Sequence, residues 1–294
     1  MFAIIDNPVS GKGNRAALAE RIQAVLTERG FSVRLFATEC SGDGVRQARL
    51  ALEEGYRNIV CIGGDGTLSE VISVIAGSDA VLYMVPCGTG NDFARAYGLT
   101  GDPYDAFLAQ LDGERSVIDL GSVNGKPFLN VSGTGFDVEV LRKTEELKAI
   151  YPGPKAYSKA VLSVISKYKA RELEISIDGS EPVKRRVTIL EVANGRYFGG
   201  GMQVAPRARF DDGLFDVVLI KPVYSFMIPF LLPLFILGIH IYLPIASVVR
   251  AKRVTICSRE KGGMVINIDG QLEDMQIAQY EILPEALHVM KPKK

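Results

Sequence analysis

The sequence lacks net charge, because its 34 lysines and arginines balance 34 aspartates and glutamates. It therefore has neither the basic excess typical of nucleic-acid binding nor the acidic excess of a solvating tail. We expect no nucleic acid partner, and any anionic ligand has to be held by a local site. With 294 residues, 47% of them apolar, the chain can bury one large core or two ordinary ones.

Cysteine and histidine are scarce. The four cysteines form no CxxC pair and have no metal-ligand spacing, so a reducing compartment is the simplest setting. His240 and His288 have no partners at the spacing of a metal site or a catalytic triad, and we interpret both as structural. Residues 1–5 lead directly into a strand pattern rather than a secretory signal, and we expect a cytoplasmic protein.

Two common nucleotide-binding motifs are also missing. The loop NPVSGKG at residues 7–13 lacks GxxxxGK[ST], so it is not a Walker P-loop. The first turn carries no GxGxxG followed by an acidic residue after the second strand, which disfavours a nicotinamide dehydrogenase.

The sequence has instead a glycine-rich stretch, CIGGDGTLSE, at residues 61–70, where a buried strand leads into a helix. Glycine there lets the backbone approach a phosphate, and the unpaired amides of the helix start attract the anion. An ordinary strand-to-helix turn uses the same residues, so this motif alone favours phosphate binding only modestly.

Strands and helices alternate along the first 120 residues. The periodicity predicts helices over 16–29 and 41–54, between strands over 2–6, 31–37, 58–62 and 81–85. This order indicates parallel βαβ units, whose loops leave the carboxyl ends of the strands, where ligands bind in open α/β sheets. We predict a first domain over residues 1–120.

The pattern changes after Asp119. A hairpin is expected over 116–131, and one or two helices over 139–167. The further strands, all read as antiparallel, are 172–177, 183–193, 214–220, 253–257 and 265–268. We predict a β-rich second domain over residues 121–275.

Residues 223–249 contain no residue charged at neutral pH apart from possible protonation of a histidine, and their length would permit a membrane span. Pro229, Pro233, Gly238 and Pro244 argue against one uninterrupted helix. We expect two short helices that expose apolar surface, lying on a bilayer or shielding a lipid tail. The alternative is a pair of buried core helices.

Three loops at one sheet edge supply phosphate donors and magnesium-binding carboxylates, a mixture that suits phosphoryl transfer. These residues are Lys12, Asp65, Thr67, Thr89, Asn91 and Asp92. The pair Asp269 and Gly270 follows a strand and is either a turn or the base that accepts a proton from an attacking alcohol. The stretch 211–214 is either a cation site or a turn, and spacing alone favours the turn.

Together, several motifs in this order resemble the diacylglycerol kinase catalytic family, most closely its bacterial lipid kinases. They are NPxSG at 7–11, GGDGT at 63–67 with Glu70, GTGNDFA at 88–94, and DG at 212–213 and 269–270. The resemblance covers essentially the whole chain. It implies an N-terminal α/β nucleotide-binding domain with a parallel sheet and a C-terminal antiparallel β-sandwich domain with inserted helices. ATP would lie between them, with residues 276–294 returning to the first domain.

The resemblance also implies roles for individual residues. The nucleotide contacts would be Asn7, Pro8, Val9, Ser10, Gly11, Lys12, Thr38, Gly64, Asp65, Gly66, Thr67, Leu68, Ser69, Glu70 and Thr89. An acidic network that organises the catalytic magnesium through water would comprise Asp65, Asp92 and Asp119, and Asp269 would be the general base. A structural magnesium ion would be held by the carbonyls of Arg209 and Leu214 and the side chain of Asp212, which reverses the preference for a turn.

One position beside the cofactor departs from the family pattern. The family usually has Asp-Gly-Glu, whereas this chain has Gln271, whose amide can hydrogen-bond but supplies no negative charge. Glu273 would point the same way on a regular strand. The related NAD kinases share GGDGT, but the loop at 88–94 and the apolar segment suit a lipid better than a soluble dinucleotide.

We therefore expect an ATP- and magnesium-dependent kinase that phosphorylates a hydroxyl of a membrane lipid, with diacylglycerol as the first candidate. It would dock on the inner face of the membrane through residues 223–249. The alternatives are a nucleotide- or lipid-binding protein with weak or lost activity, a kinase for phosphatidylglycerol or a sphingoid base, and a kinase for a soluble acceptor. A homodimer stays open, since sheet edges and apolar patches serve either a partner or a membrane.

Overall fold

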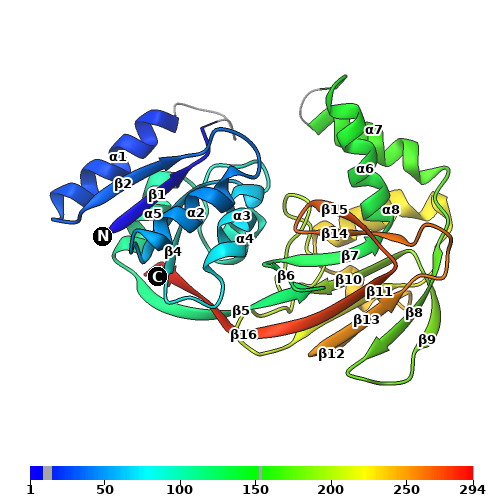
Figure 1. Cartoon of the computed structure of the whole chain (residues 1–294). Coiled ribbons are helices and arrows are strands. Elements are labelled where there is room, and N and C mark those ends of the chain that lie inside the picture. Colours follow the sequence, from blue (N-terminus) through cyan, green and yellow to red (C-terminus); the bar gives the residue numbers. More distant parts are fainter. Residues whose placement is uncertain (9–14, 152–153, 294) are drawn as a thin grey trace.

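Apolar runs of five or six residues form the buried parallel strands of the first half. The computed structural model describes residues 1–8, 15–151 and 154–293. Strands β1 (Phe2–Asp6), β3 (Asn58–Gly63) and β4 (Val81–Pro86) pair in parallel, and β2 (Val33–Ala37) closes the edge beside β1. The predicted parallel βαβ arrangement is confirmed (Figure 1).

Helices cover both faces of this parallel sheet. Apolar side chains of α1 (Arg15–Glu28) and α5 (Pro103–Leu111) pack on one face. Those of α2 (Asp43–Glu53), α3 (Asp65–Ile75) and the short α4 (Asp92–Ala96) pack on the other. Burial of both faces explains why the strands read as continuous apolar runs instead of alternating ones.

Two long strands carry this sheet into the second half of the chain. β5 (Glu114–Val123) and β16 (Ile277–Lys291) pair antiparallel, with a register shift between Leu283 and Leu287. Near its end β16 pairs in parallel with β4, and near its start it pairs with β13 (Arg253–Cys257). One ten-stranded sheet thus runs through both lobes, and the last segment lies beside the first domain.

The second lobe is a sandwich of two antiparallel layers. Its six-stranded sheet has the order β12-β11-β10-β7-β14-β15. These strands are β7 (Val131–Gly135), β10 (Ile189–Ala193), β11 (Phe215–Ile220), β12 (Ala246–Ala251), β14 (Met264–Ile268) and β15 (Gln271–Met275). The facing layer continues the long sheet through β6 (Lys126–Phe128), β8 (Arg171–Ile177) and β9 (Val183–Val187). The predicted α/β plus β-sandwich architecture is confirmed.

The single strand predicted over 183–193 is wrong, because the chain divides at Thr188. β9 is an exposed edge strand with the sequence VKRRV, whereas β10 is buried along its whole length and belongs to the other sheet. The amide of Thr188 donates to the carbonyl of Ile220, and its carbonyl accepts from the amide of Phe136. These bonds hold the crossing point between the two layers.

Helices α6 (Phe136–Lys148), α7 (Pro154–Ile165) and α8 (Ile228–Ile236) cover the outer face of the six-stranded sheet. The prediction of two short helices over 223–249 is wrong. The segment forms one α-helix between two 3₁₀ turns, Ser225–Met227 and His240–Tyr242, and then enters β12. Pro229 falls in the first turn of α8, where a missing amide costs nothing, and Gly238 with φ 69° ends it. Among the described residues no helix is long and apolar enough to cross a membrane.

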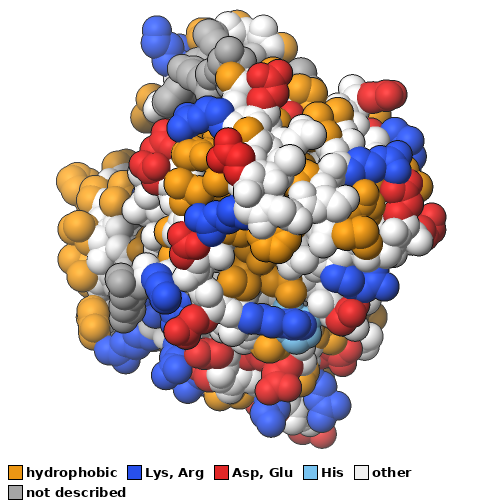
Figure 2. Space-filling model, turned by 90° about the vertical axis from the view of Figure 1, so that its left-hand side faces the viewer, with side chains coloured by type: hydrophobic (Ala, Val, Ile, Leu, Met, Phe, Trp, Pro, Cys, Tyr) orange, Lys and Arg blue, Asp and Glu red, His pale blue; other side chains and the backbone are white. Residues whose placement is uncertain are grey.

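This segment is apolar on both of its sides. Ile228, Leu231 and Phe235 are buried against the sandwich. Large side chains on the other side are exposed to water: Tyr224, Phe226, Phe230, Ile236, Leu237, Ile239 and Tyr242. Charged side chains of both signs are interspersed with apolar ones over the face shown in Figure 2.

The pairing of β16 with the first lobe generates a stability prediction. Leu287 is fully buried in the core of that lobe, whereas Ile277 in the same strand is 47% exposed. We expect Leu287→Ala to lower the free energy of unfolding by about 2–5 kcal/mol, because it removes buried methyl groups and leaves a cavity. Ile277→Ala is the control, with a loss below about 1 kcal/mol. Equal losses in urea denaturation would contradict this placement.

Candidate active site

The ends of the first parallel strands bring three predicted nucleotide contacts together. The side-chain amide of Asn7, just after β1, donates to Thr67 Oγ1 at 3.0 Å. The amide of Thr38, just after β2, donates to the carbonyl of Asp6 at 2.8 Å, and its hydroxyl is buried with no partner in the structure. Polar groups from three loops therefore meet at the carboxyl edge of the sheet, where α/β proteins bind ligands.

Two glycine loops touch backbone to backbone at this edge. A Cβ atom on Gly88 would lie 2.5 Å from the Cα atom of Gly64, and one on Gly64 would lie 3.0 Å from the Cα atom of Gly88. Both positions therefore require glycine for packing of the loops against each other. This packing sets the position of the GGDGT turn at the start of α3.

Asp65 and Asp92 form an acidic pair at the centre of these loops. Asp65 Oδ1 accepts a hydrogen bond of 2.9 Å from the amide of Asp92, and so binds the start of α4. Asp92 Oδ2 accepts one of 2.9 Å from the amide of Gly200, which belongs to the second lobe. Asp92 Oδ1 is buried and accepts no hydrogen bond from another residue of the described part of the chain.

Burial controls the protonation of this pair. Loss of water contact raises the pKa of Asp65, although backbone amides oppose the rise. Burial raises the pKa of Asp92 to about 6, with a smaller rise from the neighbouring charge of Asp65. A cation near the orphan oxygen would lower both values.

Asp269 lies in the turn between β14 and β15 with φ 46°, a left-handed conformation that aspartate tolerates better than most residues. Its carboxylate accepts hydrogen bonds from the amides of Leu129, Asn130 and Val131, at 2.5, 2.9 and 3.1 Å. Burial raises the pKa of Asp269 to about 6, against the lowering effect of these amides. The carboxylate is thus fixed by the chain segment that precedes β7.

A cavity of about 400 Å³ joins these groups across the two lobes. From the first lobe it is lined by Asp65, Thr89, Gly90 and Asp92. From the second lobe it is lined by Asn130, Asp137, Tyr157, Gly200 and Asp269, among others. Three carboxylates predicted from the sequence, Asp65, Asp92 and Asp269, therefore face one space although about 200 residues separate the first from the last.

Other predicted site residues lie elsewhere. The carboxylate of Glu70 accepts from the amides of Gly42 and Gly44, both at 2.9 Å, and so binds the start of α2. The side chain of Leu68 packs in the core, and its amide donates to the carbonyl of Gly64. Neither residue lines the cavity, and each has a structural partner. Val9, Ser10, Gly11 and Lys12 lie outside the described residues, while Pro8, Gly66 and Ser69 stay predictions.

Asp119 also has a structural partner on each carboxylate oxygen. Oδ1 accepts from the amide of Glu285 at 2.9 Å, and Oδ2 accepts from the amide of Gly213 at 2.7 Å. Asp119 does not line the 400 Å³ cavity, unlike Asp65 and Asp92. It ties the register shift of β16 to the loop before β11.

That loop contains the predicted structural cation site. Asp212 Oδ1 accepts from the amide of Leu214 at 3.2 Å, and its other oxygen pairs with Arg250. Arg209 Nε contacts Asp211 at 3.0 Å. A guanidinium therefore balances the Asp212 carboxylate here, and a magnesium ion would compete with Arg250. Within the described ranges, no group of three or more His, Cys, Asp or Glu residues has metal-binding spacing.

Gln271 starts β15 as an exposed residue, opposite Ile268, and does not line the cavity. Glu273, two residues along, forms an ion pair with Lys126. Neither residue supplies charge to the acidic pair.

Sequence reasoning missed the second-lobe groups of the cavity. Gly200 lies in the run Gly199 to Gly201, whose φ values of 61°, 85° and 113° are readily adopted only by glycine. That triple glycine was the available signal. The backbone amides of residues 129–131 could not be recognised from the sequence as partners of Asp269, because nearly every residue has a backbone amide.

An apolar slot opens beside the acidic cavity. It has a volume of about 40 Å³ and shares Asp137, Tyr157, Phe198 and Met202 with that cavity. Its other walls come from α6, the ends of β10 and β11, and α8. The acidic site therefore continues into an apolar space beneath the segment 223–249.

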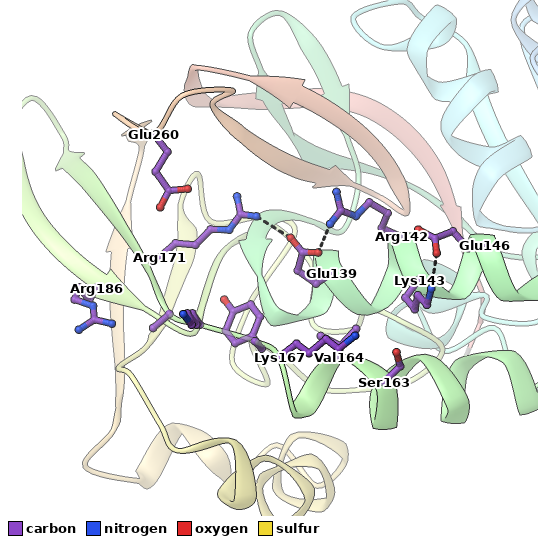
Figure 3. Close-up of a pocket in the computed structure, with 13 residues that line it drawn as sticks. Glu139, Arg142, Lys143, Glu146, Ser163, Val164, Lys167, Arg171, Arg186 and Glu260 are labelled. Carbon is purple, nitrogen blue, oxygen red and sulfur yellow. Dashed lines mark hydrogen bonds and ion pairs between the residues drawn. The ribbon is translucent and has the colours of Figure 1, made fainter.

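A third hollow, of about 660 Å³, lies on the far side of α6 and α7 (Figure 3). Glu139 contacts both Arg142 and Arg171, and Lys143 contacts Glu146. Three further cations line it without an ion-pair partner in the described part of the chain: Lys167, Lys169 and Arg186. Cations outnumber carboxylates in the lining of this hollow, which shares no residue with the acidic cavity.

Comparison with known proteins agrees with this two-lobe site. The profile of the diacylglycerol kinase catalytic domain matches residues 1–123, and that of the YegS C-terminal NAD kinase beta sandwich-like domain matches residues 130–291. A diacylglycerol kinase of Mycobacterium tuberculosis is 32% identical over 98% of this chain and 94% of its own. The chain belongs to the diacylglycerol kinase-like lipid kinases. This family consists of phosphotransferases.

Three further proteins are similar to this chain. A Pseudomonas aeruginosa protein named "Probable lipid kinase YegS-like" is 35% identical over 95% of this chain and 92% of its own. A solved diacylglycerol kinase structure from Bacillus anthracis has a TM-score of 0.74 at 20% identity, covering 99% of this chain and 96% of that one. An NAD kinase of Archaeoglobus fulgidus in complex with ATP has a TM-score of 0.55 at 16% identity, covering 100% and 95%. The solved structures share the fold.

The raised pKa of Asp92 generates a prediction. Its folded value of about 6 exceeds the unfolded value, so the ionised group destabilises the fold above pH 6, and this penalty fades as the pH falls. We expect Asp92→Asn to raise the free energy of unfolding by about 1–3 kcal/mol at pH 7.5 and by less than about 1 kcal/mol at pH 4.5. Urea denaturation at both pH values measures the change. A gain that is the same at both would show that Asp92 carries no charge penalty.

Proposed function

We propose that the protein transfers the γ-phosphoryl group of ATP to a hydroxyl of a membrane lipid, with diacylglycerol as the substrate and phosphatidic acid as the product. The observation that carries this proposal is the single cavity onto which Asp65 and Asp92 of one lobe and Asp269 of the other face. Acceptor and donor can meet there, and phosphoryl transfer depends on that positioning.

ATP would bind at the carboxyl edge of the parallel sheet. Asn7, Thr38 and Thr67 offer polar side chains there, and the unpartnered hydroxyl of Thr38 is free to bond a nucleotide. The start of α3 adds the positive end of a helix dipole, which favours phosphate. The same fold holds ATP in the archaeal NAD kinase.

The acidic pair fits a magnesium ion. Asp92 Oδ1 accepts no hydrogen bond from another described residue, and burial together with the charge of Asp65 raises the pKa of Asp92, a cost of ionisation that a divalent cation would remove. Among the described residues of the first lobe, two carboxylates face the cavity, so magnesium would keep several waters and bind ATP oxygens, as this ion commonly does. The ion would neutralise charge on the transferred group.

Asp269 would act as the general base. The lipid hydroxyl gives its proton to the Asp269 carboxylate as its oxygen bonds to the γ-phosphorus, and the bond between that phosphorus and the ADP oxygen breaks. The amides of residues 129–131 orient the carboxylate, and a pKa of about 6 leaves it ionised at neutral pH.

The lipid would enter from the side of α8. The apolar slot that joins the cavity holds about 40 Å³, which is little more than the share of one water molecule, so an acyl chain has to displace α8 from the sandwich. The exposed aromatic side chains Tyr224, Phe226 and Phe230 would rest on the bilayer. The unpaired cations Lys167, Lys169 and Arg186, beside α7, would face anionic lipids.

Transfer of labelled γ-phosphate to lipids in mixed micelles tests the proposal. We expect wild type with magnesium to label diacylglycerol and Asp269→Asn to lose about 10²–10⁴-fold in kcat, because the amide cannot accept the proton. Asp274→Asn, which changes an exposed carboxylate in the adjacent strand, is the control and stays active. The wild-type kcat rises with pH around pH 6, where Asp269 ionises.

Different products separate this proposal from the alternatives. Labelling of phosphatidylglycerol or a sphingoid base instead would keep the lipid kinase and change the substrate. ATP binding without product from any lipid would reject the kinase reaction. Activity that appears only in Gln271→Glu would indicate a binding protein that has lost the reaction.

Membrane docking makes a separate prediction. We expect the double variant Phe226→Ser, Phe230→Ser to lower pelleting with phosphatidylcholine and phosphatidylglycerol liposomes by about tenfold, since two exposed rings no longer enter the interface. Leu35→Ser, which removes a 43% exposed side chain from the first lobe, leaves pelleting unchanged. Equal pelleting of both variants would place the docking surface elsewhere.

A further inference from the structure

A buried acid lies in the core of the sandwich, outside the proposed chemistry. Glu191, in the middle of β10, is fully inaccessible to water. Its side chain lies over Gly133 of the neighbouring β7, where a Cβ atom would come within 2.2 Å of Glu191 Oε2. The glycine makes room for the carboxyl group, which a leucine could replace at lower cost to stability.

The side chain of Glu191 lies next to a second acid, Asp137 in the first turn of α6. All four oxygens of the two carboxyl groups are buried, and none of them accepts a hydrogen bond from another described residue, so a proton held between the two acids would satisfy them. Asp137 lies where the acidic cavity meets the apolar slot. The pair therefore stands directly behind the proposed active site.

Asn267 connects this pair to the turn that holds the proposed base. Its side chain lies beside Asp137 at the edge of the cavity, and its Oδ1 accepts a 2.7 Å hydrogen bond from the amide of Gly270. Asn267 of β14 and Glu191 of β10 are both paired with Gly133, one on each side of β7. The strand register thus aligns the acid, the amide and the turn in one row.

Two carboxylates cannot both be ionised in this environment. Burial, followed by the charge of Asp137, raises the pKa of Glu191 well above its ordinary value, and burial raises the pKa of Asp137 to about 6. Three phenols, those of Tyr157, Tyr168 and Tyr280, lie near the pair, and burial raises the pKa of each, with a further rise from the negative charge of the acids. Glu191 is therefore the protonated donor at neutral pH and Asp137 the acceptor.

We propose that Glu191 and Asp137 share one proton and that this pair, acting through Asn267, positions the Asp269–Gly270 turn for phosphoryl transfer. The inference rests on the proposed function, since the turn matters only if Asp269 is the base. Loss of the shared proton at high pH would set two carboxylates against each other, displace Asp137 from Asn267 and loosen the turn. Glu191 is a positioning residue and does not touch the substrate.

The pH profile of phosphate transfer tests this proposal with a matched pair of variants. Glu191→Gln keeps a donor that cannot ionise, so we expect kcat within about twofold of wild type at pH 7 and no fall at alkaline pH. Glu191→Leu has similar volume and no donor, and we expect kcat to drop about tenfold or more with the KM for ATP unchanged. Thr134→Val, in the same sheet, is the control for a general disturbance of the core.

Superimposable pH profiles of Glu191→Gln and wild type, together with full activity of Glu191→Leu, would overturn the proposal. Hydrogen exchange supplies a readout that needs no activity. We expect the amide of Gly270, which donates to Asn267, to exchange faster in Glu191→Leu than in wild type or Glu191→Gln. Equal exchange in all three would also overturn it. If the wild type phosphorylates no lipid, the proposed function is rejected instead. The hydrogen exchange of the Gly270 amide then still tests whether Glu191 affects the turn.

Discussion

The placement of the two lobes depends on the pairing of β5 with β16. These strands run through both lobes, and β16 contacts β4 at one end and β13 at the other, so the register of one ribbon sets the distance between the two halves of the site. The ribbon is not regular, since Glu285 has φ 51° at the register shift. Asp119 binds the amide of that residue and the amide of Gly213, which fixes the irregular point to the second lobe. We interpret this carboxylate as the clamp of the interdomain joint.

The acidic site exploits this rigid joint. The amide of Gly200 reaches Asp92 across the lobes, while the amides of residues 129–131 hold Asp269 opposite. Burial makes each carboxylate expensive to ionise, with pKa values of about 6 for Asp92 and Asp269. The folded protein therefore carries an unfavourable free energy of ionisation at these carboxylates, which a bound cation or the uptake of a proton would reduce. Such a cost is typical of functional sites.

Much of this arrangement was predictable from the sequence, because local patterns encode it. The apolar runs and glycine stops gave the parallel sheet, and the GGDGT and GTGNDFA loops placed Asp65 and Asp92 at one edge. Contacts between residues far apart in the sequence were not predictable. The carboxylates of Asp119 and Glu70 accept hydrogen bonds from backbone amides of distant segments. Glu191 and Asp137 lie next to each other only because β10, β7 and α6 are neighbours in the fold. The prediction of a single strand over 183–193 was wrong for the same reason, since periodicity does not show that the chain changes from one sheet to the other at Thr188. For Asp269, the same two residues, Asp-Gly, fit both a simple turn and a general base. Only the fold shows that the carboxylate lies at the cavity.

The most direct test of a single site shared by two lobes is a double-mutant cycle in the phosphate-transfer reaction. Asp92→Asn and Asp269→Asn alter one carboxylate of each lobe, and single-turnover rates with saturating ATP and lipid measure both variants and their combination. If both groups act on one transferred phosphoryl group, the double variant loses far less than the product of the two single losses. Losses that multiply would mean that the carboxylates act independently, and would contradict a shared site at the joint of the lobes.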